Sequence, residues 1–132
     1  MAAKALHVVA GVIFSPMRDS VLIARRPQSS HQGGLWEFPG GKLAEGESPF
    51  AALCRELQEE LAIDVIQAQA FLEVSHHYPD KAILLDVWRV EAFAGVARGN
   101  EGQQIAWVSL AELENYSFPA ANDAIIDRLL GR

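Results

Sequence analysis

The segment from Gly41 to Ile63, GKLAEGESPFAALCRELQEELAI, constrains the fold more than any other part of this chain. It places Glu56, Glu59 and Glu60 at positions i, i+3 and i+4, which share one face of an α-helix. Like charges at that spacing repel each other, so a helix with only a structural role gains nothing by collecting them. A divalent cation removes the conflict, because Mg²⁺ takes carboxylate oxygens and leaves coordination positions open to phosphate. The pattern therefore favours a metal site for phosphate chemistry over a solvated acidic surface.

The residues around the glutamates predict where this helix begins and which face it buries. Ser48 suits the N-cap, and Pro49 suits the first turn, where a missing N–H costs nothing. The single Cys54 falls within the apolar stripe, so we expect a packing residue rather than a reactive thiol. Residues at helical spacing form that stripe and leave the glutamates on the opposite side: Phe50, Cys54, Leu57 and Leu61.

Length and composition limit the classes of protein that the chain can belong to. Its 132 residues, 50% hydrophobic and 21% charged, predict one globular domain over residues 1–132. A net charge of −6 argues against general nucleic-acid binding, which usually needs a basic surface. The apolar run near the N-terminus lacks the features of a signal peptide, and no run approaches the length of a membrane span. We expect a cytoplasmic protein without membrane or nucleic-acid partners, acting as a monomer on a small molecule.

The remaining segments predict strands on both sides of the glutamate helix and further helices at the end of the chain. Asn122 is a credible N-cap for the last helix. This order gives an α+β layered domain. We predict a hairpin from strands 6–14 and 21–26, a loop over 27–34, a short strand in LWEFPGG, extended segments near 66–77, 82–92 and 104–109, and helices near 109–116 and 122–130.

The glutamate segment resembles the Nudix box. That pattern reads Gly, five residues, Glu, seven residues, Arg-Glu, an aliphatic residue, any residue, Glu-Glu, any residue, Gly and an aliphatic residue. Ala62 stands where the family usually has glycine, at a helix end whose backbone shape alanine adopts at some cost. The positions that match are Gly41, Glu47, Arg55, Glu56, Leu57, Glu59, Glu60 and Ile63.

The resemblance implies the Nudix α/β/α sandwich with a central mixed β-sheet, and hydrolysis that depends on Mg²⁺, for which Mn²⁺ can substitute. We assign Glu56, Glu59 and Glu60 to the metals, and by resemblance the backbone carbonyl of Gly41 as a further ligand. Arg55 is expected to orient the carboxylate of a neighbouring glutamate. Glu47 would close the turn onto the helix by accepting a similar hydrogen bond.

A further acidic candidate is Glu101, in the glycine-rich segment GNEGQQIAW. Nudix proteins commonly bring one more glutamate to the metal from such a loop, so the resemblance implies that Glu101 is a metal ligand or a base. The alternative is a solvated loop residue. Between Glu56 and Glu101 as general base, we favour Glu56.

Outside the box, the chain is similar to the MutT group of the Nudix family. The shared segments are LHVVAGVI, ARRP, LWEFPGGK, RELQEEL, YPDKAILLDVW, NEGQ and FPAAN. MutT enzymes hydrolyse oxidised guanine nucleoside triphosphates, chiefly 8-oxo-dGTP, to the monophosphate and pyrophosphate by attack at the β-phosphorus. Asn122 matches the asparagine that reads the base in this group, since an amide offers a donor and an acceptor to a purine edge. The competing interpretation makes Asn122 only a helix cap.

The same similarity predicts a nucleotide pocket. Arg26 matches a nucleotide-contacting arginine, whereas Lys81 replaces an arginine near the base and would stack more weakly. Lys42 lies close to the glycine turn and supplies counter-charge for phosphates. Apolar residues that match the base pocket are Leu6, Val8, Phe38, Ile83 and Pro119, although an apolar strand residue taken singly is more often part of the core than a ligand contact.

Two other functions compete with 8-oxo-dGTP hydrolysis. One is a related pyrophosphohydrolase for pyrimidine triphosphates such as CTP or modified dCTP, against which FPAAN argues because those relatives tend to lack the asparagine. The other is a non-catalytic Nudix-like recognition module. Such modules typically lose the box glutamates, and this chain keeps them all.

Overall fold

The computed structural model describes residues 5–29 and 33–132, and residues 30–32 of the predicted 27–34 loop lie outside them. Two 3₁₀ turns, η1 and η2, precede the last helix. The elements in chain order are β1 (Leu6–Ile13), β2 (Ser20–Arg25), β3 (Trp36–Glu37), β4 (Gly40–Lys42), α1 (Pro49–Leu61), β5 (Asp64–Tyr78), β6 (Lys81–Ala94), β7 (Ile105–Ser109), η1 (Leu110–Asn115), η2 (Ala120–Asn122) and α2 (Asp123–Leu129).

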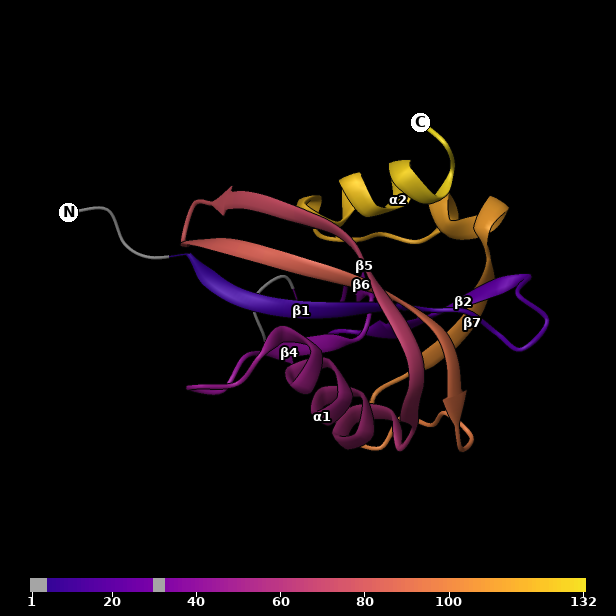
Figure 1. Cartoon of the computed structure of the whole chain (residues 1–132). Helices are drawn as coiled ribbons and strands as arrows, with labels where there is room; N and C mark the ends of the chain where they lie inside the picture. The colour runs from indigo at the N-terminus through magenta and orange to yellow at the C-terminus, as the bar shows by residue number, and fades with distance from the viewer. Residues whose placement is uncertain (1–4, 30–32) are drawn as a thin grey trace.

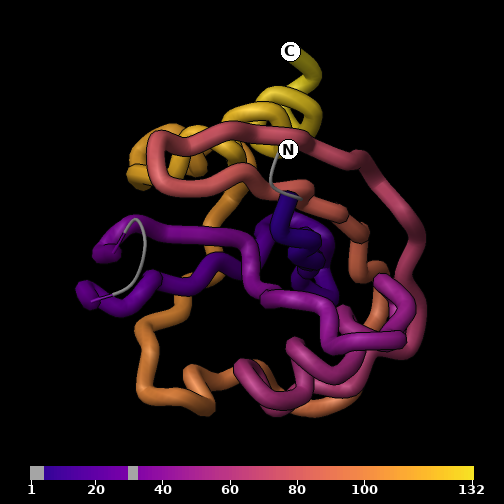
Figure 2. Tube along the Cα trace, turned by 90° about the vertical axis from the view of Figure 1, so that its left-hand side faces the viewer, coloured from indigo at the N-terminus to yellow at the C-terminus, as the bar shows by residue number. Residues whose placement is uncertain are grey.

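The strands form a mixed sheet and a smaller antiparallel one. The four-stranded sheet has the order β4-β1-β6-β5, with β1 parallel to β6 and the other pairs antiparallel. The three-stranded sheet has the order β3-β2-β7. Helix α1 lies on one side of the sheets and α2 on the other (Figure 1), and the view turned by 90° shows the same separation (Figure 2). This arrangement confirms the predicted α/β/α sandwich with its mixed sheet.

The predicted hairpin between the first two strands is wrong. β1 and β2 belong to different sheets and share only an isolated bridge between Phe14 and Val21. β6 pairs with one edge of β1 along its whole length and β4 pairs with Val8–Ala10 on the other edge, so β2 meets this strand only at its end. The chain therefore crosses into the second sheet after β1.

Strand β1 runs between two apolar cores. Val9 and Ile13 pack with α1, whereas Ala10 and Val12 pack with the core on the α2 side. Its last five residues are all buried, as expected for a strand that is covered on both faces. The alternation that places Val9 toward α1 also directs Val8 to the opposite face, where the candidate site begins.

The buried stripe of α1 differs from the predicted one. The helix begins after Ser48, whose hydroxyl accepts a hydrogen bond from the Ala51 N–H at 3.2 Å. Phe50 is 43% exposed and Cys54 is only partly buried, so their prediction as core residues is wrong. The face of α1 that carries residues 53, 57 and 61 packs against β1, so residue 54 lies at the border of the buried face. The buried residues of the helix are Ala52, Leu53, Leu57 and Leu61.

The end of α1 has the backbone shape expected from the box. Ala62 forms the C-cap with φ 60° and ψ 34°, the left-handed conformation that glycine adopts readily and alanine does not. Its N–H donates to the Gln58 carbonyl at 3.0 Å. Of the two later helices predicted, the first is the 3₁₀ turn η1 and the second is α2. No helix among the described residues is long and apolar enough to cross a membrane.

Candidate active site

The turn before α1 is held against the helix by Glu47 and Arg55. Arg55 donates to both carboxylate oxygens of Glu47, and the Ala44 N–H donates to one of them at 2.9 Å. The guanidinium also donates to the Lys42 carbonyl at 3.1 Å, which ties the helix to the end of β4. The hydrogen bonds from Arg55 are the largest cause that lowers the pKa of Glu47 to about 2. The charged pair therefore fixes the geometry of the glycine turn.

The same guanidinium reaches two of the helix glutamates. Arg55 Nη1 donates to Glu56 Oε1 at 3.0 Å and to Glu59 Oε2 at 3.2 Å. Burial raises the pKa of Glu56, an effect that Arg55 opposes. Glu59 is more exposed, with 52% of its side chain accessible against 16% for Glu56. Glu56 is thus the helix glutamate that is both oriented and shielded from water.

Glu60 points toward the interior between α1 and the sheet. Its Oε2 is buried and has no hydrogen-bond partner among the described residues. Burial is the largest cause that raises the pKa of Glu60 to about 9, and the charges of Glu37, Glu56 and Glu101 add to it. A hydrogen bond from the Gly40 backbone acts in the opposite direction. An acid in these surroundings requires a nearby positive charge to ionise at neutral pH.

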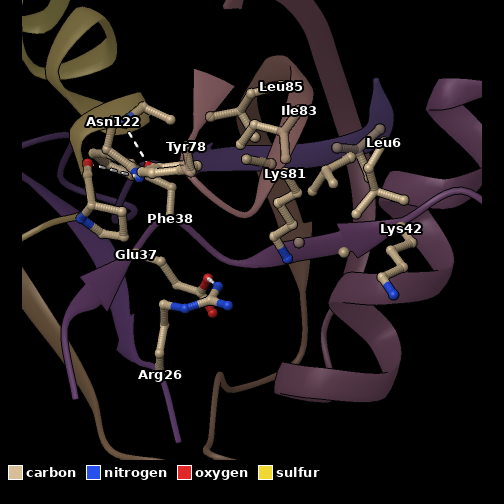
Figure 3. Close-up of a pocket in the computed structure, with 17 residues that line it drawn as sticks. Leu6, Arg26, Glu37, Phe38, Lys42, Tyr78, Lys81, Ile83, Leu85 and Asn122 are labelled. Carbon is tan, nitrogen blue, oxygen red and sulfur yellow. Dashed lines mark hydrogen bonds and ion pairs between the residues drawn. The ribbon is translucent and has the colours of Figure 1, made fainter. Parts of the chain in front are cut away.

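A pocket of about 230 Å³ opens on the sheet face away from α1, among β1, β4, β6 and η2. Asn122, Tyr78 and Phe38 lie at one end of the pocket in Figure 3, Lys42 lies at the other beside α1, and Lys81 lies between. All nine residues predicted to contact substrate line this pocket: Leu6, Val8, Arg26, Phe38, Lys42, Lys81, Ile83, Pro119 and Asn122.

Asn122 occupies the N-cap position of α2, as predicted, but its side chain does not cap the helix. Its backbone is already helical, with φ −84° and ψ −10°, and its side chain makes no capping hydrogen bond. Only 7% of Asn122 is exposed, and it is the one polar residue buried in the described part of the chain. Within the described residues its amide makes a single hydrogen bond, a long one of 3.4 Å to the Pro119 carbonyl. Because η2 runs directly into α2, the chain enters the helix earlier and Asn122 is free to face the pocket.

The chain from residue 9 to residue 128 matches the family model of the NUDIX domain. It belongs to the Nudix family. An 8-oxo-dGTP diphosphatase of Proteus vulgaris is 51% identical over 90 residues, 68% of this chain and 80% of that protein. A CTP pyrophosphohydrolase of Escherichia coli K12 is 35% identical over 128 residues, 96% and 93% of the two chains. A solved structure of a MutT protein, from work on Aliivibrio salmonicida and Vibrio cholerae, has a sequence 42% identical to this one. Its fold matches with a TM-score of 0.85, over 97% of this chain and 98% of that chain.

Nudix hydrolases require a divalent metal, and the acidic residues of this Nudix chain fit one. No three acidic, histidine or cysteine side chains within residues 5–29 and 33–132 converge on one point by themselves. The unpartnered Glu60 oxygen nevertheless lies where a cation would compensate it. A Cβ on Gly41 would stand 2.4 Å from the Glu56 carboxylate, so only glycine leaves this space open. Carboxylate and carbonyl oxygens are the donors that hard cations prefer. The roles of Gly41, Glu56, Glu59 and Glu60 as ligands remain predictions.

The loop that carries Glu101 packs on the C-terminal end of α1. Asn100 Nδ2 donates to the Glu59 carbonyl at 2.9 Å, and Gln103 Nε2 donates to the Glu60 carbonyl at 3.0 Å. Glu101 itself is exposed and lines a shallow hollow together with Arg25 and Arg26. Its charge raises the pKa of both Glu56 and Glu60, which places it within electrostatic reach of the box.

Two polar side chains at the pocket, those of Glu37 and Tyr78, were not predicted from the sequence. Glu37 is ion-paired with Arg26 at 2.5 Å (Figure 3), and burial raises its pKa although Arg26 opposes this. Tyr78 accepts a hydrogen bond from the Ala121 N–H at 2.8 Å and so holds η2 in place. An acid inside the apolar run LWEFP was a signal for Glu37. Nothing in the sequence indicated the contact of Tyr78 with η2, which joins segments 43 residues apart.

Proposed function

We propose that this Nudix hydrolase is a Mg²⁺-dependent nucleoside triphosphate pyrophosphohydrolase that converts 8-oxo-dGTP to 8-oxo-dGMP and pyrophosphate. The observation that carries the proposal is the buried amide of Asn122, which faces a pocket whose other end adjoins the glutamate helix. The 51% identity to an 8-oxo-dGTP diphosphatase supports the same substrate. Removal of this nucleotide from the precursor pool would prevent its misincorporation into DNA. We place this activity in the cytoplasm, with free nucleotides as substrates of a monomer.

Base recognition would take place at the Asn122 end of the pocket. The amide can donate to one atom of a purine edge and accept from another, which an apolar pocket cannot do. The one side-chain hydrogen bond that Asn122 makes within the described residues is long, so its amide remains available to a base. Phe38 stacks on Phe118 with ring centroids 5.5 Å apart and supplies a flat apolar surface beside the amide. A site built to satisfy hydrogen bonds of one base rejects an analogue that leaves them unpaired.

Hydrolysis would take place at the Lys42 end of the pocket, beside α1. Bound Mg²⁺, or Mn²⁺ in its place, would neutralise phosphate charge and lower the pKa of a water molecule. Glu56 accepts the proton of the attacking water, and Arg55 holds its carboxylate in orientation. The new bond forms at the β-phosphorus, and the bond to the nucleoside monophosphate oxygen breaks. Lys42 and Arg26 line the pocket and offer positive charge to the phosphates.

A pyrimidine triphosphate is the second candidate substrate. Two observations favour it: the 35% identity to a CTP pyrophosphohydrolase, and the presence of Lys81 where the MutT group has an arginine. A non-catalytic module is disfavoured, because every box glutamate is present and Arg55 donates hydrogen bonds to Glu47, Glu56 and Glu59 in a defined arrangement.

Pyrophosphate release from 8-oxo-dGTP, dGTP, CTP and 5-methyl-dCTP, each with Mg²⁺ and with EDTA, tests the proposal. We expect turnover that requires the metal, with kcat/KM clearly higher for 8-oxo-dGTP than for dGTP. If kcat/KM for either pyrimidine triphosphate is tenfold or more above that for 8-oxo-dGTP, the pyrimidine triphosphate is the substrate. No turnover with any nucleotide, in Mg²⁺ or Mn²⁺, would support the recognition module.

A further inference from the structure

The side-chain amide of Gln103 connects the loop of Glu101 to the helix of Glu60. Gln103 Oε1 accepts a hydrogen bond from the Glu101 N–H at 2.9 Å, and Gln103 Nε2 donates to the Glu60 carbonyl at 3.0 Å. The two partners fix which end of the amide is which, because a carbonyl only accepts and an N–H only donates. One rigid planar group therefore sets the spacing between the backbones of two candidate metal ligands.

The loop has further contacts with the same helix end. The last carbonyls of a helix have no intrahelical partner. Here the Asn100 N–H donates to the Glu60 carbonyl at 2.9 Å, and the Arg98 N–H donates to the Leu61 carbonyl at 3.0 Å. Asn100 Nδ2 adds the bond to the Glu59 carbonyl. These contacts cap α1 and hold the loop in place, but none of them touches Glu101.

The loop turns sharply at Glu101. The Gly102 N–H donates to the Gly99 carbonyl at 3.0 Å, and Gly102 has φ +84°, which a residue with a side chain rarely adopts. Glu101 thus lies at the tip of a tight turn, exposed to solvent, where its own side chain has few neighbours to restrict it. In addition to the Gly99–Gly102 bond that closes the turn, the hydrogen bond from its N–H to Gln103 fixes the backbone position of Glu101.

We propose that Gln103 is a positioning residue, whose amide holds the Glu101 backbone at a fixed distance from Glu60 so that the Glu101 carboxylate can join the metal site. The inference rests on the proposed function only in that it assumes a divalent metal at the box glutamates. Residues that support metal ligands in this way typically contribute about 10- to 100-fold to metal affinity or activity.

If Gln103 had a purely structural role, a different result would be expected. Asn100 is the matched control residue for this comparison. Both side chains are amides of the same loop, and each donates one hydrogen bond to a terminal carbonyl of α1. Only Gln103 also binds the Glu101 backbone. If capping of the helix were the whole role, Gln103→Met and Asn100→Ala would have similar effects.

The test combines Gln103→Met, Glu101→Gln, the double variant and Asn100→Ala. Mn²⁺ affinity is measured by calorimetry without nucleotide, and kcat and KM are measured with the best nucleotide substrate. We expect Gln103→Met to weaken Mn²⁺ binding about tenfold or more and to lower kcat with KM little changed. Asn100→Ala should change Mn²⁺ binding less than threefold, and Gln103→Met should add nothing in the Glu101→Gln background.

Equal effects of Gln103→Met and Asn100→Ala, or full additivity of Gln103→Met with Glu101→Gln, would overturn the inference. The Mn²⁺ measurements need no knowledge of the substrate, so they remain decisive if 8-oxo-dGTP is not hydrolysed. Should a variant fold poorly, amide hydrogen exchange in the wild-type chain gives the same answer. We expect exchange of the Glu101 N–H to be slow and to slow further with Mg²⁺, and rapid exchange unaffected by Mg²⁺ would contradict the proposal.

Discussion

Glu47 and Arg55 are joined by two hydrogen bonds of 2.8 Å, from Nε to Oε2 and from Nη2 to Oε1. This paired geometry is the strong form of an ion pair, because both groups are planar and both bonds are charge-assisted. It connects the turn before α1 to the middle of that helix, and it also determines where Arg55 can reach Glu56. Both the shape of the glycine turn and the orientation of Glu56 therefore depend on it.

The first prediction concerns acid stability. Because the pKa of Glu47 is lowered to about 2 in the fold, its stabilising contribution is present above its ordinary value near 4.5 and is lost as the pH falls toward 2. Glu47→Gln should therefore be less stable than the wild type at pH 7, and the difference should shrink between pH 4.5 and 2. Urea unfolding across this range measures it. The exposed Glu45→Gln is the control, and an equal loss there would show that the pair is not special.

A second prediction has the opposite pH dependence and concerns Glu60. Its pKa is raised to about 9, so its favourable contribution is complete below 4.5 and is lost as the pH rises toward 9. Glu60→Gln removes this loss and should stabilise the protein in EDTA by about 1–3 kcal/mol at pH 8, on the order of one to two pKa units, but not at pH 5. Thermal unfolding at both pH values checks it. No gain at pH 8 would mean that Glu60 ionises freely in the fold.

Glu56→Gln tests the assignment of the base. Replacement of the carboxylate by an amide keeps the size of the side chain and removes its ability to accept a proton. We expect kcat to fall by about 10²–10⁴-fold, the usual contribution of a general base, while the unfolding transition stays in place. Steady-state kinetics measures kcat, and circular dichroism follows the unfolding transition. Near-normal turnover would mean that Glu101 rather than Glu56 is the base, and the variant Glu101→Gln tests that alternative.

Asn122→Ala separates base recognition from helix capping. Since Asn122 makes no capping hydrogen bond, its loss should hardly change the stability of α2. Loss of a buried contact to the base should instead cost about 1–3 kcal/mol in binding of the oxidised nucleotide. Calorimetric binding of 8-oxo-dGMP and dGMP measures the discrimination. Asn115→Ala, in an exposed position at the end of η1, is the control. Unchanged discrimination would remove Asn122 from the recognition site.

Ala62→Gly is expected to stabilise the fold. Ala62 occupies the left-handed region at φ 60°, which costs a residue with a Cβ about 1–2 kcal/mol. Part of this gain is offset by the greater freedom of glycine in the unfolded chain, so a net stabilisation of about 0.5–1 kcal/mol is expected. The same substitution at Ala51, an exposed residue within α1, should destabilise by a similar amount. Chemical denaturation of both variants checks the contrast.

Prediction from sequence succeeded where the information is local. Ser48 and Pro49 defined the start of α1, the spacing of its glutamates placed them on one face, and the left-handed cap at Ala62 followed from the box pattern. The long strands and the last helix were also found, because their hydrophobic periodicity extends over many residues. The pocket residues came from similarity to the MutT group, and all of them line one cavity.

The sequence by itself determined the glutamate helix, its turn and the order of the elements, because these depend on neighbouring residues and on the periods of helix and strand. Only the tertiary structure decided which strands pair with β1, and so separated β2 into a second sheet. It alone revealed the Arg26–Glu37 pair, the Tyr78 contact with η2, and the bridge from Gln103 to Glu60, which spans 43 residues. These contacts depend on how distant segments pack, and the side chains that make them carry no local signal of their partners.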